Sequence, residues 1–420
     1  MKISSCLIVK NESENIARCL ESQQNIADEI IVVDTGSTDN TKEIASKFGA
    51  KILDYAWDNN FSNAKNYALD HATGDWIIFL DADEYLEINT QKVLKQVFKH
   101  VDKDKAIDSV LCKMVNIDGY NGRIISVNPI VRILRGKCGI RFSGAVHEQP
   151  LKNNNPLMSV NITDYNLIIY HTGYSSALIP EKAKRNIEIL EKEIANNQIT
   201  NLTYYYMSSS YFNLKNYEES VRYALLALKD PDMKLTIMAH QPYIFLIKSM
   251  LLQKGKYATQ EIEKYVDMAL KEFPTHPEVW FVRGNLKREQ NDYFAAIESY
   301  LKAIEYNKNY NLLLNNDFPL QLESVHIYLA ELYIKTGDPI RAMEYYFGAL
   351  KIDRYNFVSF TGLYKLVKNQ APAEIVFFLN SIYNKENKRD LVFLITSLAK
   401  LGNQLLANYY ADHYKKYEKV

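Results

Sequence analysis

Four short, nearly continuous apolar runs in the first eighty or so positions restrict the fold more than any other feature of this sequence. They are ISSCLIV at 3–9, EIIVVD at 29–34, AKILDY at 50–55 and DWIIFLD at 75–81. Segments with helical periodicity separate the runs, at 15–23, 38–49 and 61–72. Runs of this kind are typical of strands buried on both faces, which occur almost only in parallel sheets covered by helices. The N-terminal part is therefore expected to be an α/β domain with a Rossmann-like, mostly parallel sheet.

Beyond about residue 180 the strand pattern stops and pairs of helices recur. The pairs are expected at 202–230, 240–274, 275–307 and 323–356, with two weaker pairs at 357–385 and 390–418. A period near 34 residues resembles that of tetratricopeptide repeats. In the fourth pair, Gly337 and Asp338 suit the turn, and Ala342 and Ala349 suit a close approach of two helices. The sequence thus predicts three parts: a domain at 1–180, a linker helix at 181–199 and an all-α repeat domain at 200–420.

The charges of the chain balance, because 50 Lys and Arg residues face 50 Asp and Glu residues. This argues against a nucleic acid polymer as partner, since such a partner requires a basic surface. The N-terminus has no secretory signal pattern, and no apolar run approaches the roughly 20 residues needed for a transmembrane segment. The four cysteines show no CxxC spacing. We therefore expect a reduced, cytoplasmic protein, with docking on the inner membrane face as the alternative.

Two aspartates follow the fourth apolar run directly. Asp81 and Asp83, with Ala82 between them, end the stretch IIFLDADE. A D-x-D segment in extended conformation directs both carboxylates to one side, and Mg²⁺ or Mn²⁺ prefers such oxygen ligands together with substrate phosphates. Asp34 ends the second run, and ligands of parallel sheets bind at the carboxyl ends of the strands. The pattern predicts a metal–diphosphate site; the alternative is a helix cap and a turn residue.

Five blocks in a fixed order strengthen this prediction. They are CLIVKNESENI at 6–16, EIIVVDTGSTDNT at 29–41, FSNAKNYAL at 61–69, GDWIIFLDADE at 74–84 and FSGAVHEQP at 142–150. With these blocks the chain resembles the inverting family 2 glycosyltransferases of the GT-A fold, over residues 3–175. The resemblance implies an enzyme that uses a nucleotide-sugar donor, usually a UDP-sugar, and a Mg²⁺ or Mn²⁺ cofactor.

The resemblance also implies the residues that bind the donor. Glu12 and Asp34 match positions that hold the nucleoside, with Val9 near the base, and Lys65 and Asn66 match the block beside the base and diphosphate. The expected nucleotide-sugar site comprises Val9, Glu12, Asp34, Lys65, Asn66, Asp81, Ala82 and His147. The GSTD turn after Asp34 is interpreted as a helix N-cap and is left outside the site.

Glu148 is the expected catalytic base. It follows an apolar Ala-Val pair in the block that the family uses on its acceptor side, where burial would raise its pKa toward a useful range. A surface glutamate beside a turn is the alternative. The neighbouring His147 is either a substrate contact or a structural histidine, and it is the second candidate for the base.

His171, in LIIYHTGY, is expected to complete the metal site with Asp81 and Asp83, because family members often place a C-terminal histidine there and imidazole suits Mn²⁺. A structural histidine is the alternative. Arg132 and Arg135, in PIVRILRG, are weaker candidates for phosphate or acceptor contacts.

The two-part plan is similar to that of the peptide glycosyltransferases that modify bacteriocins (glycocins). Their DAD, VHE and Y-H-x-G-Y blocks are matched at 81–83, 146–148 and 170–174. This resemblance implies transfer of a hexose or N-acetylhexosamine to a cysteine, or a serine, of a precursor peptide acceptor, and a homodimer formed by the helical part. One alternative is a family 2 enzyme that builds cell-wall, polysaccharide or lipid-linked glycan. Another is a repeat scaffold with an inactive transferase half.

Overall fold

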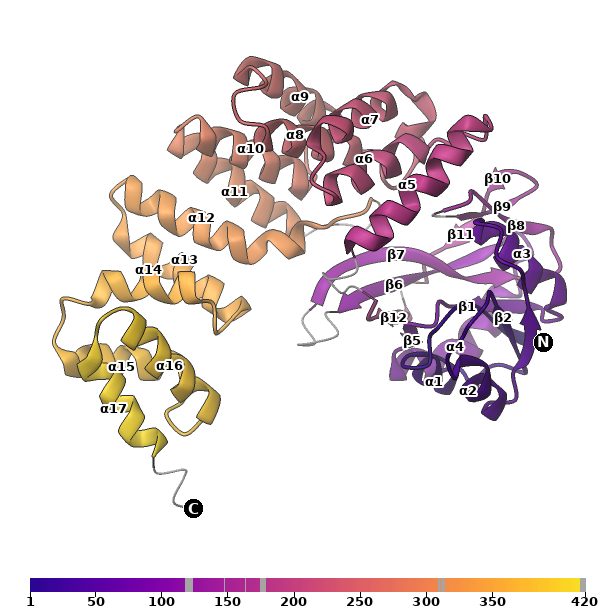
Figure 1. The fold of residues 1–420 in the computed structure, drawn as a ribbon, viewed down its shortest axis with the longest axis horizontal. Coiled ribbons are helices and arrows are strands. Elements are labelled where there is room, and N and C mark those ends of the chain that lie inside the picture. Colours follow the sequence, from indigo (N-terminus) through magenta and orange to yellow (C-terminus); the bar gives the residue numbers. More distant parts are fainter. Residues whose placement is uncertain are drawn as a thin grey trace. The chain divides into compact units, whose positions relative to one another are not determined.

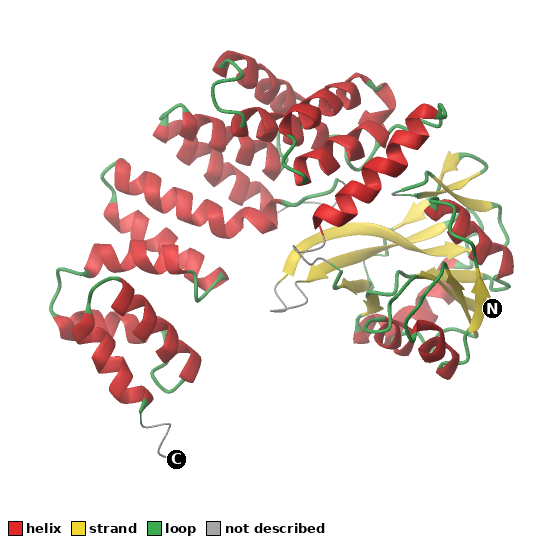
Figure 2. Ribbon diagram, viewed as in Figure 1, coloured by secondary structure: helices red, strands yellow, loops and turns green. Residues whose placement is uncertain are grey.

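The computed structural model describes residues 1–117, 124–146, 148–162, 164–173, 179–308, 310 and 314–415. Within these residues, every strand lies before residue 172 and the elements from Ile179 onward are helices. Figure 2 shows the strands confined to the part of the chain that precedes the long series of helices. The predicted succession of an α/β part and an all-α part is therefore confirmed.

The main sheet has the strand order β3-β2-β1-β4-β7-β6-β12-β5, with β11 paired to β6. Its strands are β1 (Ile3–Val9), β2 (Glu29–Asp34), β3 (Lys51–Asp54), β4 (Trp76–Phe79), β5 (Glu84–Leu86), β6 (Ser109–Ile117), β7 (Ile124–Arg135), β11 (Ser159–Val160) and β12 (Ile168–His171). The four predicted runs form the parallel half, β3-β2-β1-β4. β7 runs antiparallel to both β4 and β6, and β12 runs antiparallel to β5, so the mostly parallel sheet is mixed.

Alternate residues of the parallel strands enter two different cores, as strands covered on both faces require. Val32 and Ile78 pack with α1 (Ile16–Glu21), α2 (Thr41–Lys47) and α4 (Ile88–Val101), which Figure 1 labels near one another. Val33 and Phe79 face the opposite side and pack with α3 (Phe61–His71) and β8 (Ile140–Ser143). β8 belongs to a second sheet, β10-β9-β8, with β9 (Gln149–Lys152) and β10 (Asn155–Pro156).

The helical part begins with α5 (Ile179–Ala195) and continues in antiparallel pairs. The further helices are α6 (Thr203–Asn213), α7 (Tyr217–Lys229), η2 (Pro231–Leu235), α8 (Gln241–Leu252), α9 (Thr259–Glu272), α10 (Pro277–Glu289), α11 (Tyr293–Lys308), η3 (Phe318–Gln321), α12 (Leu322–Lys335), α13 (Pro339–Ile352), α14 (Phe357–Val367), α15 (Pro372–Ile382), α16 (Lys388–Lys400) and α17 (Gln404–Tyr414). All six predicted helix pairs are present in this series.

The turn of the fourth predicted pair has the expected chemistry. Gly337 adopts a φ of 83°, which favours glycine, and the Asp338 side chain accepts a hydrogen bond from the Arg341 N–H at 3.0 Å. Ala342 and Ala349 are fully buried on α13. Small residues at these two positions let α12 and α13 pack closely.

By its contacts the chain divides into two compact units, Met1–Pro274 with Asn309–Pro319, and Thr275–Lys308 with Leu320–Val420. The first unit holds the sheets and the helices up to α9, and the second holds α10 to α17. The boundaries expected from the sequence, at 180 and 199, stay a prediction. Among the described residues, none of the helices combines the length and the apolar character that a bilayer crossing requires.

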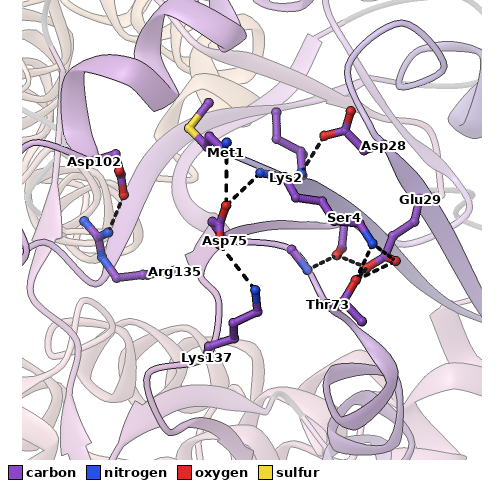
Figure 3. Close-up of polar contacts among 12 residues, drawn as sticks. Met1, Lys2, Ser4, Asp28, Glu29, Thr73, Asp75, Asp102, Arg135 and Lys137 are labelled. Carbon is purple, nitrogen blue, oxygen red and sulfur yellow. Dashed lines mark hydrogen bonds and ion pairs between the residues drawn. The ribbon is translucent and has the colours of Figure 1, made fainter.

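A polar network ties together the N-terminal ends of the parallel strands (Figure 3). The Glu29 carboxylate forms an ion pair with Lys2 at 2.7 Å and accepts hydrogen bonds from the Ser4 hydroxyl and from the N–H and hydroxyl of Thr73. Burial alone would raise the pKa of Glu29, but the bonds from Lys2, Ser4 and Thr73 lower it from 4.5 to about 2. The charged carboxylate therefore stabilises the folded state.

Replacing Glu29 with Gln is expected to lower stability at pH 7 by about 1–2 kcal/mol, because a charge-assisted set of bonds becomes neutral. Since the folded-state pKa is depressed, the contribution of Glu29 is fully present above pH 4.5 and is lost as the pH falls toward 2. The difference in melting temperature between the two proteins should shrink over that window. Glu43→Gln, in an exposed pair with Lys47 on α2, is the control and should change little. A pH-independent difference for Glu29→Gln would contradict the argument.

Candidate active site

The carboxyl ends of β1, β2 and β4 meet at one edge of the sheet. The strands are parallel, and their register pairs Val9 with Asp34 and Cys6 with Phe79. Asp34 is the last residue of β2, and Asp81 lies two residues beyond the end of β4. The structure thus brings the predicted nucleoside and metal residues to the same edge, as the parallel arrangement requires.

Asp34 has one carboxylate oxygen engaged and one without a partner. Oδ1 accepts hydrogen bonds from the N–H groups of Gly36 and Ser37, both at 2.9 Å. Oδ2 is buried and has no hydrogen-bond partner within the part of the chain that is described. Buried carboxylate oxygens are nearly always paired. Oδ2 is therefore suited to accept a bond from an N–H or O–H group of a ligand.

Val9 lies beside Asp34 in the sheet, and Glu12 follows Val9 three residues later. The Val9 side chain is buried, and its carbonyl accepts a bond from the Thr35 N–H at 2.9 Å. The Glu12 carboxylate accepts a bond from the Asn15 amide at 3.0 Å. Burial raises the pKa of Glu12, and the charges of Asp83 and Asp81 add to the effect. Glu12 is therefore close enough to the D-x-D segment to share its electrostatic field.

Lys65 is the centre of the site. It projects from α3, is only 2% exposed, and contacts both Glu148 and Asp81, with 3.5 Å between Nζ and Asp81 Oδ1. Its ammonium also lies 5.2 Å from the Phe79 ring and 5.3 Å from the Phe142 ring. Burial lowers the pKa of Lys65, but Asp81 and Glu148 outweigh it, so the net pKa is raised and the side chain is charged. One buried cation thus joins the predicted base to the predicted metal motif.

Arg132 holds the other side of Asp81. Its Nη2 lies 2.7 Å from Asp81 Oδ2 and 2.6 Å from Glu84 Oε1, and its Nε donates to Glu84 Oε2 at 2.9 Å. Burial alone would raise the pKa of Asp81, but Arg132, Lys65 and His171 hold it well below its usual range. In this arrangement Asp81 is the partner of two cations, and its role as a metal ligand stays a prediction.

Sequence reasoning missed Glu84. Glu84 is buried at the start of β5, where burial raises its pKa against the opposing effect of Arg132. Its Oε2 also accepts a bond from the Asp81 N–H at 3.1 Å, so it fixes the D-x-D turn. The available signal was a third carboxylate directly after the motif, in a segment that is otherwise apolar.

Asp83 faces His171 across the end of β12. Asp83 Oδ2 lies 3.3 Å from His171 Nε2, and His171 Nδ1 lies 2.7 Å from Asn116 Oδ1. Because that oxygen can only accept, Nδ1 carries the proton. Burial lowers the pKa of His171, but the hydrogen bond and charge of Asp83 raise it overall. The structure therefore brings together the two predicted ligands and gives the imidazole an outer partner, a common feature of metal-binding histidines.

Gly173 lies directly against Asp83 and His171. A Cβ at Gly173 would lie 1.9 Å from Asp83 Oδ2 and 2.8 Å from His171 Nε2, so no other residue fits there without a shift. A carboxylate and an imidazole are suitable donors for Mn²⁺, and the carboxylate for Mg²⁺. The residues present thus fit the expected divalent cation.

Two predicted residues, Asn66 and Ala82, have structural surroundings that the motifs do not suggest, and a third cannot be compared. Asn66 clamps β8, since its amide donates to the Phe142 carbonyl at 2.9 Å and accepts from the Phe142 N–H at 2.8 Å. The Ala82 side chain is buried, so only its backbone can reach a ligand. His147 lies outside the described residues.

Arg135 makes structural contacts away from the candidate site. Its guanidinium bonds to Asp102 at 2.8 Å and to the Ile107 carbonyl at 2.6 Å, and it stacks on Trp76 at 4.4 Å. These contacts occupy the donors of Arg135 within the fold. Of the two arginines, only Arg132 reaches the carboxylates of the site.

Comparison with known proteins identifies both parts of the chain. Residues 4–145 match the family model described as glycosyl transferase family 2, and residues 277–310 match a tetratricopeptide repeat. Over residues 4–145 the N-terminal part is thus similar to glycosyl transferase family 2, and its mixed, Rossmann-like sheet is the expected GT-A fold. The repeat match coincides with α10 and α11.

Among curated proteins, the chain is similar to the glycosyltransferase SunS of the SPbeta prophage of Bacillus subtilis, with 32% identity over 291 residues. The match covers 67% of this chain and 66% of SunS, slightly less than two thirds of that protein. A TPR repeat-containing protein of Synechococcus elongatus is 37% identical over 147 residues, 35% of each chain.

Among solved structures, glucosyl-3-phosphoglycerate synthase from Mycobacterium tuberculosis is 25% identical over 28% of this chain and 45% of its own. The TM-score is 0.24. Similarity at this level does not carry the ligands of that enzyme over to this chain.

Removing the central cation is expected to destabilise the domain strongly. Lys65→Met leaves the Glu148 and Asp81 carboxylates without one of their partners, and breaking a buried pair costs about 3–5 kcal/mol. Adding Glu148→Gln to this variant should restore part of the loss, which a double-mutant cycle of denaturation experiments measures. Lys42→Met, which removes an exposed cation paired with Asp54, is the control and should change the stability little. Equal losses for the two lysines would refute the central role of Lys65.

Proposed function

We propose that this protein is an inverting, metal-dependent glycosyltransferase. It moves a hexose or N-acetylhexosamine from a UDP-sugar to a cysteine, or a serine, of a bacteriocin precursor peptide. The observation that carries the proposal is the contact of Lys65 with both Asp81 and Glu148, within a family 2 domain. This contact supports a site in which the D-x-D segment and the candidate base would act together, as group transfer between two substrates requires.

On the donor side, Asp34 and Glu12 would bind the nucleoside. The unpartnered Asp34 Oδ2 can accept a bond from the N–H of a uracil or from a ribose hydroxyl. Val9 supports the same edge from β1, next to Asp34 in the sheet. Because Val9 and Asp34 are buried, a bound base would contact them in place of water.

Asp83 and His171 would hold the Mg²⁺ or Mn²⁺ ion, with Asp81 as a further candidate ligand. When bound, such an ion neutralises negative charge on the diphosphate of the leaving group. The residues of the chain orient it: Asn116 fixes the His171 ring, and the absent side chain of Gly173 leaves room for the Asp83 oxygen. Arg132 and Lys65 keep Asp81 ionised beside it.

On the acceptor side, Glu148 would remove the proton of the attacking thiol. As the S–H bond breaks, the sulfur forms a bond to C1 of the sugar, and the bond from C1 to the diphosphate oxygen breaks. The electron pair of that bond leaves with UDP, and attack from the opposite face inverts the anomeric centre. The Glu148 side chain is 12% exposed, so a substrate can reach it.

Two arguments support a peptide acceptor. The similarity to SunS spans 291 residues, more than the 180 residues expected for the transferase domain, so it extends into the helical part. Glycocin glycosyltransferases, which the motifs resemble, combine these two parts.

Within such a peptide, cysteine is favoured over serine. A thiol has an ordinary pKa of about 8.5, so a carboxylate deprotonates it more readily than a serine hydroxyl. The homodimer and the cytoplasmic location expected from the sequence remain predictions.

The metal site is tested by binding of UDP. Asp83→Ala is expected to abolish the gain in UDP affinity that Mn²⁺ provides, and His171→Ala to weaken it about 10–100-fold, because each removes a ligand or its orientation. Isothermal titration with and without Mn²⁺ measures both effects. The control is Asp70→Ala, which removes an exposed carboxylate on α3 that pairs with Arg141 of β8. A Mn²⁺ dependence unchanged by Asp83→Ala would move the metal elsewhere.

The reaction is tested with peptides that differ only in having Cys, Ser or Ala at one position. Each is incubated with the enzyme, Mn²⁺ and a panel of UDP-sugars, and intact masses are measured. A hexose or N-acetylhexosamine mass is expected on the Cys peptide and not on the Ala peptide. Glu148→Gln should lower turnover by about 10²–10⁴-fold while UDP-sugar still binds. Transfer to saccharide or lipid acceptors and to none of the peptides would favour a glycan-building enzyme instead.

A further inference from the structure

One face of α5 contacts the segment that leads to Glu148. Arg185, Ile189 and Glu193 are spaced four residues apart and so lie on one side of the helix. The Arg185 guanidinium lies 5.3 Å from the Phe61 ring, and Ile189 packs in one apolar cluster with Ala145, Val146 and Phe61. Glu193 Oε1 accepts a hydrogen bond from the Ala145 N–H at 2.6 Å. The helix expected to be a linker is therefore part of the surroundings of the candidate base.

The loop at Gly144 and Ala145 is held from two sides. From α3, the Ser62 hydroxyl donates to the Gly144 carbonyl at 2.5 Å, and the Phe61 N–H donates to the Ala145 carbonyl at 2.9 Å. From α5, the Glu193 carboxylate accepts a hydrogen bond from the N–H of Ala145. Gly144 has a φ of 96°, so the chain turns sharply there and depends on these bonds to keep its path. Glu148 follows three residues after Ala145.

Glu193 also reaches the first repeat helix. Its Oε2 accepts a bond from the Thr203 hydroxyl at 3.4 Å, and Thr203 is the first residue of α6. The carboxylate therefore joins the loop before Glu148 to the beginning of the helical pairs.

Burial of the Glu193 carboxylate by itself lowers the stability of the fold. The residue is 6% exposed, and it forms no ion pair with any residue that the structure describes. Burial raises the pKa of Glu193, and the bonds from Ala145 and Thr203 oppose this only in part. An apolar residue of similar size would avoid this cost, since buried acids without a cation are unfavourable. The hydrogen bonds to Ala145 and Thr203 are what the glutamate provides and an apolar residue would not.

We propose that Glu193 is a positioning residue that sets the place of Glu148 relative to the helical part of the first unit. It accepts the Ala145 N–H on one oxygen and the Thr203 hydroxyl on the other, so a displacement of α6 is transmitted to the loop. In the proposed reaction the helical pairs present the acceptor, so this link aligns the acceptor with its base. The inference rests on the proposed function for the role of Glu148, but the contact itself does not.

Two substitutions separate the hydrogen bonds from mere bulk. Glu193→Gln keeps an oxygen for Ala145 and offers an amide donor to the Thr203 oxygen, so it should behave like the wild type. Glu193→Leu keeps the volume but leaves the Ala145 N–H without a partner. Glu188→Leu, an exposed position on the same helix, is the matched control.

Hydrogen exchange of the full chain, read by mass spectrometry, tests the contact without any assay of activity. Peptides that cover residues 143–148 should exchange faster in Glu193→Leu than in the wild type, while Glu193→Gln and Glu188→Leu stay protected. Equal exchange in all four proteins would overturn the inference. If Glu193→Leu fails to fold, Thr203→Val replaces it and should loosen the same peptides; no change there would overturn the link to α6.

Kinetics then test the positioning role. Glu193→Leu should lower kcat for peptide transfer about 10–100-fold, as misplacement of a catalytic group does, with the affinity for UDP unchanged. Glu193→Gln should restore kcat. A loss shared by Gln and Leu, or a loss of UDP binding alone, would contradict positioning through these bonds. If the wild type transfers to no acceptor, the proposed function fails, and the exchange data still decide the contact.

Discussion

The ammonium of Lys65, buried between Glu148 and Asp81, is the interaction on which the rest of the site depends. The carboxyl edge of the sheet gathers Glu12, Asp81, Asp83, Glu84 and Glu148, and so many acids in a partly buried space would repel one another. Lys65 and Arg132 compensate them from two directions, Lys65 at Glu148 and Asp81 and Arg132 at Asp81 and Glu84.

The elements that carry these charges are held by backbone contacts, not by the charges alone. Asn66 clamps β8 through both polar groups of Phe142, and α3 holds the following loop through the Ser62 hydroxyl and the Phe61 N–H. The same helix α3 supplies Lys65. A single helix thus positions the cation, the strand and the loop, which keeps the distance from the D-x-D segment to Glu148 constant. α5 adds a third support through Glu193.

The parts that sequence reasoning found are those with a local signal. Asp34, Asp81 and Asp83 were predicted because each ends or follows an apolar run, and parallel strands bring such ends together. His171 was found from the family motif, and the structure brings it to Asp83. Glu84 and Glu193 have no such signal, because each is an ordinary glutamate in the sequence and becomes significant only through burial. Asn66 shows the converse, since its motif suggested a ligand contact and its amide is occupied by β8.

The sequence alone determined the succession of an α/β domain and helical pairs, because the spacing of apolar residues is a local property that each strand and helix carries by itself. It also determined the acids at the carboxyl ends of the first strands, since the chain order fixes them there. Only the tertiary structure decided that β7 enters the sheet antiparallel and brings Arg132 to Asp81, that Lys65 bridges two carboxylates, and that α5 packs on the loop before Glu148. These contacts join residues between 16 and 83 positions apart, and no periodicity in the sequence encodes which distant partners meet in a closed core.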